Sequence, residues 1–79
     1  MKKIRLEELA AHDGKENRPA WVAFEGKVYD VTESFLWQNG EHQVLHHAGR
    51  DLTEEMSQAP HGGEMLKIFP IVGELDTAN

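Results

Sequence analysis

The sequence predicts a small α+β domain with a strand near each end, one β-hairpin and several short helices. Three observations lead to this prediction. Residues 21–31 are rich in β-branched and aromatic side chains and are divided by one Glu-Gly pair, apolar residues elsewhere recur at helical spacing over short stretches, and glycine or proline separates these stretches. Because the chain has 79 residues and no repeat or linker, we expect residues 1–79 to form a single domain.

The start of the chain predicts a strand followed by one short helix. Ile4–Leu6 has the composition of a short strand. Leu6, Leu9 and Ala10 then recur at helical spacing, with acidic residues between them. We therefore expect a helix over residues 6–11 whose apolar side carries these three residues.

The next element is a predicted hairpin. Residues 21–24 and residues 27–31 each have the composition of a strand, and the second run alternates in polarity. Glu25-Gly26 lies between them and is expected to form the turn.

The second half of the chain predicts further short helices and a closing strand. Thr32 is placed to cap one helix, and Asp51 or Thr53 is placed to cap another. Gly49 and Pro70 are placed to end helices. The ranges that we expect are a helix at 41–47, a helix that ends before residue 60, a helix at 64–69 and an edge strand at 71–75.

Composition excludes several classes of function. Eight Lys and Arg residues against fourteen Asp and Glu residues give a net charge of −6, which argues against nucleic acid or an anionic membrane as partner. With no cysteine, the chain cannot form disulfides, thiolate zinc sites, iron–sulfur clusters or covalent c-type haem. No apolar run is long enough to span a bilayer, and no catalytic motif is present. We expect a soluble, cytoplasmic protein that is not an enzyme.

Histidine is concentrated in one part of the chain. Four of the five histidines, His42, His46, His47 and His61, fall within twenty residues. A helix at 41–47 would place His42 and His46 on one face, and His61 lies in a Pro-His-Gly-Gly loop whose small neighbours leave it open to a flat ligand. Apolar residues at helical spacing are expected to line a slot between these histidines, and they are Val44, Leu45, Leu52, Met56, Ala59 and Leu66.

Imidazoles that point into an apolar slot favour a non-covalent b-type haem. Two other interpretations stay open. The histidines would form a solvated polar face above an ordinary core, or His42, His46 and His61 would bind zinc. Gln43 stands where a zinc peptidase of the His-Glu-x-x-His type has its glutamate, so the zinc interpretation offers no catalytic base.

Several stretches of the chain resemble the cytochrome b5-like haem/steroid-binding domain family. The segments 6–9 and 21–24 are similar to that family's first helix and hairpin, and the resemblance runs in order over nearly the whole chain. The most specific stretches are Gly26-Lys27-Val28-Tyr29-Asp30-Val31-Thr32, Ala48-Gly49-Arg50-Asp51-Leu52-Thr53, His61 and Val72-Gly73-Glu74-Leu75. The resemblance implies a cytochrome b5-like fold, in which a small mixed sheet carries two short helix pairs that form a haem cleft.

The resemblance also implies His61 as one axial ligand of the haem iron. Electron-transferring members carry their other ligand in a His-Pro-Gly-Gly motif. Counting back from Ala48 puts Trp37 at that position, whereas counting forward from Asp30 gives Gln38, and neither side chain is a haem ligand. Trp37 is therefore expected to line the slot at the position of the missing histidine.

A second branch of the family is similar in another respect. The eighteen-residue step from Asp30 to Ala48 resembles that of the membrane-associated progesterone receptor branch. That branch binds haem through a tyrosine whose position here is Val44, and the only tyrosine, Tyr29, lies in the hairpin. The sequence therefore stands between the two branches.

Two hypotheses remain. In the first, haem is bound by His61 and by a second ligand on the 41–47 segment, with His42 or His46 preferred over His47 and Met56. Such a protein would transfer single electrons and would attract a basic redox partner. In the second, the module binds no haem, and its cleft takes a small apolar ligand or a protein partner. The oligomeric state stays open in both.

Overall fold

The computed structural model describes residues 2–33, 41–42, 46–57 and 66–76. A four-stranded mixed sheet forms the middle of the molecule, with the strands in the order β1-β6-β3-β2. β1 is parallel to β6, and the other two pairs are antiparallel. These strands are β1 (Lys3–Arg5), β2 (Trp21–Phe24), β3 (Lys27–Asp30) and β6 (Ile71–Asp76). The predicted α+β class is confirmed.

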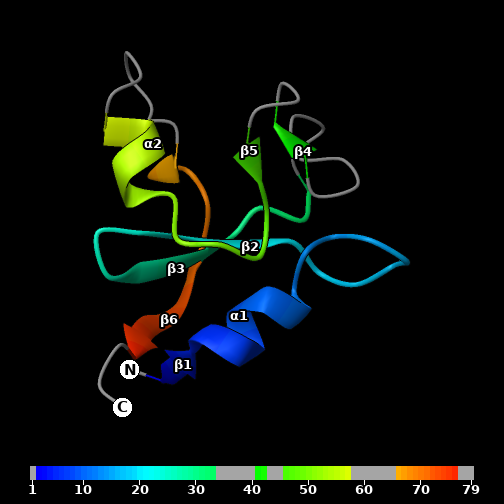
Figure 1. Ribbon diagram of the computed structural model, residues 1–79, viewed down its shortest axis with the longest axis horizontal. Coiled ribbons are helices and arrows are strands. Elements are labelled where there is room, and N and C mark those ends of the chain that lie inside the picture. Colours follow the sequence, from blue (N-terminus) through cyan, green and yellow to red (C-terminus); the bar gives the residue numbers. More distant parts are fainter. Residues whose placement is uncertain (1, 34–40, 43–45, 58–65, 77–79) are drawn as a thin grey trace.

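Shorter elements lie on both sides of the sheet. Figure 1 shows β4, β5 and α2 on one side, which we call the upper side, and α1 on the other. The bounds of these elements are α1 (Leu6–Ala11), β4 (Glu41–His42), β5 (His46–His47) and α2 (Thr53–Ser57). Within the described ranges, no helix has the length and hydropathy that a membrane span requires.

The predicted hairpin is confirmed as β2 and β3. Its two strands pair in register from Trp21 opposite Asp30 to Phe24 opposite Lys27. Glu25 and Gly26 both have positive φ, at 50° and 82°, which is the requirement of a tight two-residue hairpin turn.

The predicted helix at 6–11 is confirmed as α1, but its apolar side is narrower than expected. Leu9 is fully buried, whereas Leu6 is 52% exposed and Ala10 is also exposed. A helix of six residues makes less than two turns, so only one of its apolar positions faces the sheet.

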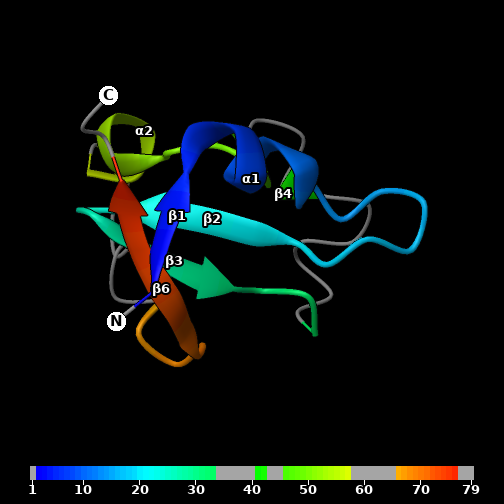
Figure 2. The same ribbon diagram turned by 90° about the horizontal axis from the view of Figure 1, so that it is seen from below.

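The closing strand was predicted to lie at an edge, and this was wrong. β6 lies between β1 and β3 and pairs with both (Figure 2). The approach of β1 is close, since a Cβ built on Gly73 would lie 2.6 Å from the carbonyl oxygen of Lys2 and 2.7 Å from Cδ1 of Ile4. Strand composition reports that a segment is extended, but not which strands flank it.

The predicted helix at 41–47 was also wrong at its described residues. Glu41–His42 and His46–His47 form an antiparallel pair, with Glu41 opposite His47 and His42 opposite His46. A helix of seven residues is too short to be stable by its own propensity, and here the two ends of the segment pair with each other instead.

The later predicted helices are partly described. The helix predicted to end before residue 60 begins at Thr53, and Asp51, one of the two residues expected to cap it, accepts the Thr53 backbone N–H on Oδ1 at 3.1 Å. Of the helix predicted at 64–69, only residues 66–69 are described, and Phe69 N donates to the Leu66 carbonyl oxygen at 3.0 Å in a short turn.

The buried residues divide into two clusters, one on each side of the sheet. Alternation along the strands separates them, because Val22 and Tyr29 face the upper side while Ala23 and Val28 face the lower side. The lower cluster is Ile4, Leu9, Ala23, Val28 and Leu75. The upper cluster is Ala20, Val22, Tyr29, Val31, Ala48, Leu52 and Leu66.

Candidate functional site

The upper cluster is the base of the candidate site. Leu52 and Leu66, both predicted to line the apolar slot, are 0% and 1% exposed and lie together in this cluster. Phe24 and Phe69 are partly buried and pack against it. The structure thus joins Leu52, which lies between His47 and His61 in the chain, and Leu66, which follows His61, on one apolar base.

The other base residues come from the hairpin and were missed in the sequence analysis. Val22 and Val31 are fully buried in the upper cluster, and Tyr29 is only 9% exposed there. The signal was present in the alternation of residues 27–31, which places every second residue on the same side of a sheet. It does not tell which of the two sides faces a ligand.

The predicted ligating and lining residues are described to different extents. Trp37, Val44, Leu45, Ala59 and His61 lie outside the described residues. The backbone of Met56 is described within α2.

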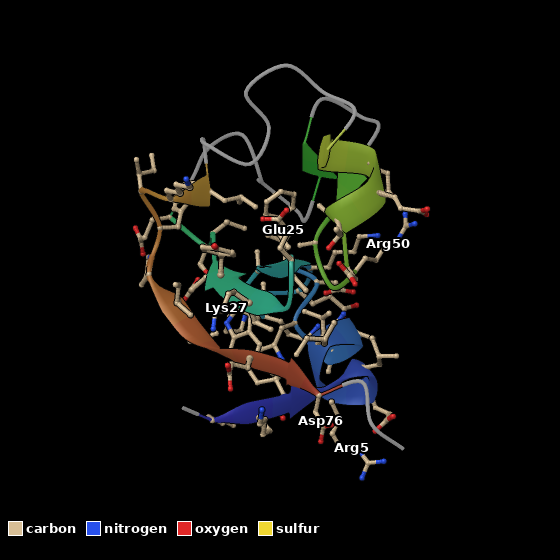
Figure 3. The ribbon with its side chains drawn as sticks, turned by 90° about the vertical axis from the view of Figure 1, so that its left-hand side faces the viewer. Arg5, Glu25, Lys27, Arg50 and Asp76 are labelled. Atoms are coloured by element: carbon tan, nitrogen blue, oxygen red, sulfur yellow. The ribbon has the colours of Figure 1, made fainter. Side chains whose placement is uncertain are left out.

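His42 and His46 remain neighbours, although not through a helix. They are direct register partners of the β4–β5 pair. The expectation that these two positions lie together is met by cross-strand pairing in place of a four-residue helical step. In Figures 1 and 3, β4, β5 and α2 all lie on the upper side of the sheet.

Residues 48–52 connect β5 to α2 and bind along the free edge of β2. Gly49 N donates to the Trp21 carbonyl oxygen at 2.6 Å, and Leu52 N donates to the Ala23 carbonyl oxygen at 2.8 Å. Ala23 N in turn donates to the Arg50 carbonyl oxygen at 3.0 Å. We call this segment the edge segment. It satisfies the outer groups of β2 and holds the start of α2 at a defined place.

Two features of the structure require glycine at position 49. Its φ is +86°, a conformation that other residues adopt only with strain. A Cβ there would also lie 3.2 Å from Cβ of Asp13 and 3.3 Å from the carbonyl oxygen of Ala10. The edge segment therefore also packs against the end of α1.

One long ion pair lies beside the start of α2. Arg50 and Glu55 approach to 3.8 Å, and the Arg50 side chain is 56% exposed. Figure 3 shows Arg50 at the base of α2, with Arg5 and Asp76 at the opposite end of the molecule. An exposed pair at this distance contributes little to stability.

The two described carboxyl groups with clearly lowered pKa values lie away from the upper cluster. Hydrogen bonds from Lys3 and then Lys27 lower the pKa of Glu74 on β6 to about 2. A hydrogen bond from the backbone N–H of Lys15, together with Arg18, lowers the pKa of Asp13 in the loop after α1. Glu74 therefore forms its ion pairs within the sheet, and Asp13 forms its hydrogen bonds within a loop.

The model of the family described as Cytochrome b5-like Heme/Steroid binding domain matches residues 5–76. The chain belongs to this family. The resemblance seen in the sequence is thereby confirmed, and so is the cytochrome b5-like fold.

Solved cytochrome b5 domains have the same fold. A Hadesarchaea cytochrome b5 domain protein is 55% identical with a TM-score of 0.91, and the match covers 96% of this chain and 100% of that one. A Methanococcoides burtonii cytochrome b5 domain protein is 47% identical with a TM-score of 0.90, covering 96% and 99%.

Curated relatives are longer than this chain. Mus musculus cytochrome b5 type B is 39% identical over an alignment of 72 residues, and the match covers 85% of this chain and 47% of that protein. Rattus norvegicus cytochrome b5 is 36% identical over 80 residues, covering 95% and 57%. The chain thus spans about half the length of the curated relatives that it matches.

Proposed function

We propose that this cytochrome b5-like domain binds one non-covalent b-type haem and transfers single electrons, with His61 as one axial iron ligand. The second ligand in this proposal is His42 or His46. The observation that supports this proposal is the arrangement on the upper side of the sheet. The His42–His46 register pair and α2 lie on the same side of the sheet as one apolar cluster.

The chemistry of the chain fits this group. Imidazole nitrogen is a strong axial ligand of haem iron, and a chain without cysteine can hold haem only without a thioether link. The described base is entirely apolar at Val22, Val31, Leu52 and Leu66, which are buried. Such a base excludes water and favours an apolar macrocycle. When bound, haem supplies an iron that changes between two oxidation states by one electron.

The relatives support the same conclusion. Several are named cytochrome b5, and the Ectothiorhodospira vacuolata cytochrome b558 is 25% identical with a TM-score of 0.66. The Fusarium oxysporum nitrate reductase is 36% identical over 78 residues that make up 8% of its length. We infer that this domain is an electron carrier for a partner and is not a catalyst by itself.

The net charge suggests the kind of partner. With a net charge of −6, the domain would attract a basic redox protein through long-range electrostatic forces, before the two surfaces touch. Attraction of this kind raises the association rate and weakens as salt increases.

Haemin titration followed by visible absorption tests the proposal. The wild type is expected to bind one haemin and to show sharp low-spin bands on reduction. His61→Ala should lose these bands, and so should one of His42→Ala and His46→Ala. His12→Gln is the matched control, because His12 stacks on Trp21 near α1 and should not affect the bands.

Two results of the titration would contradict the haem proposal. If the wild type develops no Soret band, or if the band does not depend on His61, the haem proposal is wrong. The haem-free binding module, with a small apolar ligand or a protein partner, would then replace it.

A further inference from the structure

Both ends of β2 are held by a threonine hydroxyl. The backbone N–H of Ala20, just before β2, donates to Thr32 Oγ1 at 2.9 Å. The backbone N–H of Glu25, just after β2, donates to Thr53 Oγ1, also at 2.9 Å. The two threonines come from different parts of the chain, so this match is not a consequence of one local turn.

Each threonine is oriented by an aspartate two residues earlier. Asp30 Oδ1 accepts the backbone N–H and the hydroxyl of Thr32, at 2.9 and 2.5 Å. Asp51 Oδ1 accepts the same two groups of Thr53, at 3.1 and 2.6 Å. Because each hydroxyl gives its hydrogen to the carboxylate, its oxygen is left to accept the amide at the end of β2.

We call these units the first clamp (Asp30–Thr32) and the second clamp (Asp51–Thr53). The residue in the middle of each is fully buried in the upper cluster, and these residues are Val31 and Leu52. Each clamp therefore ties an end of β2, a carboxylate and one residue of the apolar base into one unit.

The chain beyond each clamp leads to a proposed iron ligand. After Thr32 it continues to β4, which carries His42, and Thr53 is the first residue of α2, after which the chain reaches His61. The two clamped amides are five residues apart, or about 16 Å in an extended strand. β2 thus sets the distance between the origins of the two segments.

We propose that the two clamps are positioning residues that fix the separation and orientation of the two segments that bear the proposed haem ligands. This inference rests on the proposed function. It differs from a role in folding alone, because other bonds already attach both segments. Val31 N donates to the Ala20 carbonyl oxygen at 2.8 Å beside the first clamp, and the edge segment attaches the second.

Paired substitutions test the clamps. Thr32→Val and Thr53→Val keep the side-chain shape and remove the hydroxyl, whereas Thr32→Ser and Thr53→Ser keep the hydroxyl. Asp51→Asn is a milder variant that keeps an acceptor oxygen. Far-UV circular dichroism checks that each variant is folded.

Two readouts are needed. In haem-free protein, the hydrogen-exchange rate of the Ala20 amide should rise about tenfold in Thr32→Val. The exchange rate of the Glu25 amide should rise by the same factor in Thr53→Val, as expected for one lost hydrogen bond. In haem-loaded protein, each valine variant should release haemin about tenfold faster. Its ferric electron paramagnetic resonance g-values should shift, and both serine variants should resemble the wild type.

The outcomes separate this inference from the proposed function. If exchange rises in the valine variants but haemin release and the g-values stay as in the wild type, the clamps have no positioning role, while the haem proposal stands. If the serine variants do not show the wild-type values, the positioning role of the clamps is also contradicted. If wild-type protein binds no haemin, both the proposed function and this inference are wrong.

Discussion

The imidazole of His12 lies flat against the indole of Trp21, with ring centroids 3.7 Å apart and planes 5° from parallel. Two hydrogen bonds accompany the stack. His12 Nδ1–H donates to the Glu8 carbonyl oxygen at 2.7 Å, and Trp21 N donates to the His12 carbonyl oxygen at 2.9 Å. The end of α1 is thereby fastened to the start of β2, the same strand that both clamps hold.

His12→Ala removes the stack and one of these hydrogen bonds. We expect the free energy of unfolding to fall by about 1–2 kcal/mol. Urea denaturation followed by far-UV circular dichroism measures this. His12→Phe keeps a stacking ring and should recover part of the loss. Equal stability of His12→Ala and the wild type would contradict a structural role for the stack.

Gly73→Ala and Gly26→Ala should differ sharply. At Gly73 the new Cβ would lie within 2.7 Å of both the Lys2 carbonyl oxygen and the Ile4 side chain, so β1 has to move away from β6. We expect a loss of more than about 3 kcal/mol. At Gly26 no atom lies within 4 Å, and only the strain of its φ of +82° remains, about 1 kcal/mol.

Thermal unfolding of the two alanine variants measures the difference. Gly26→Ala is the matched control, since it makes the same chemical change in the turn between two strands of the same sheet. A melting temperature of Gly73→Ala as high as that of Gly26→Ala would show that β1 is not packed against β6 as described.

Glu74 should make stability depend on pH in the acid range. Lys3 and Lys27, at 3.0 and 3.1 Å, favour its ionised form and lower its pKa from 4.5 to about 2. The unfolded chain therefore binds a proton before the folded chain does. The stability from this group is fully present above about pH 4.5 and is lost as pH falls toward about 2.

Glu74→Gln should remove this dependence. The denaturant midpoint of the variant should be lower than that of the wild type near neutral pH, and the two should converge between about pH 4.5 and 2. High salt should reduce the difference, because the three side chains are partly exposed. A constant gap between the two proteins across this range would show that the Lys3–Glu74–Lys27 group does not act as described.

Elements with local determinants were predicted well. The hairpin at 21–30 depends on strand composition on both sides of a two-residue turn, and α1 depends on apolar spacing within six residues. The start of α2 at Thr53 follows from a capping pattern next to Asp51. In each case the interacting residues are near one another in the chain.

Elements whose conformation or place depends on pairing with another strand were predicted poorly. Residues 41–47 have a helical spacing of histidines, yet their described residues pair as β4 and β5. Residues 71–75 have the composition of a strand, but the position of this strand inside the sheet depends on its pairing with β1, about seventy residues away. Leu6 has the composition of a core residue and is 52% exposed, because the sheet reaches only one side of α1.

The sequence by itself determined the family, the concentration of histidines, the absence of thiolate chemistry and two residues of the apolar base, Leu52 and Leu66. These follow from residue identity and spacing along the chain. Only the tertiary structure decided that His42 and His46 are cross-strand partners, that Gly49 and Gly73 are needed for close contact, and that Thr32 and Thr53 hold the two ends of β2. The physical reason is that these hydrogen bonds and contacts join one strand or loop to another, and their energies arise only once folding has brought those segments together.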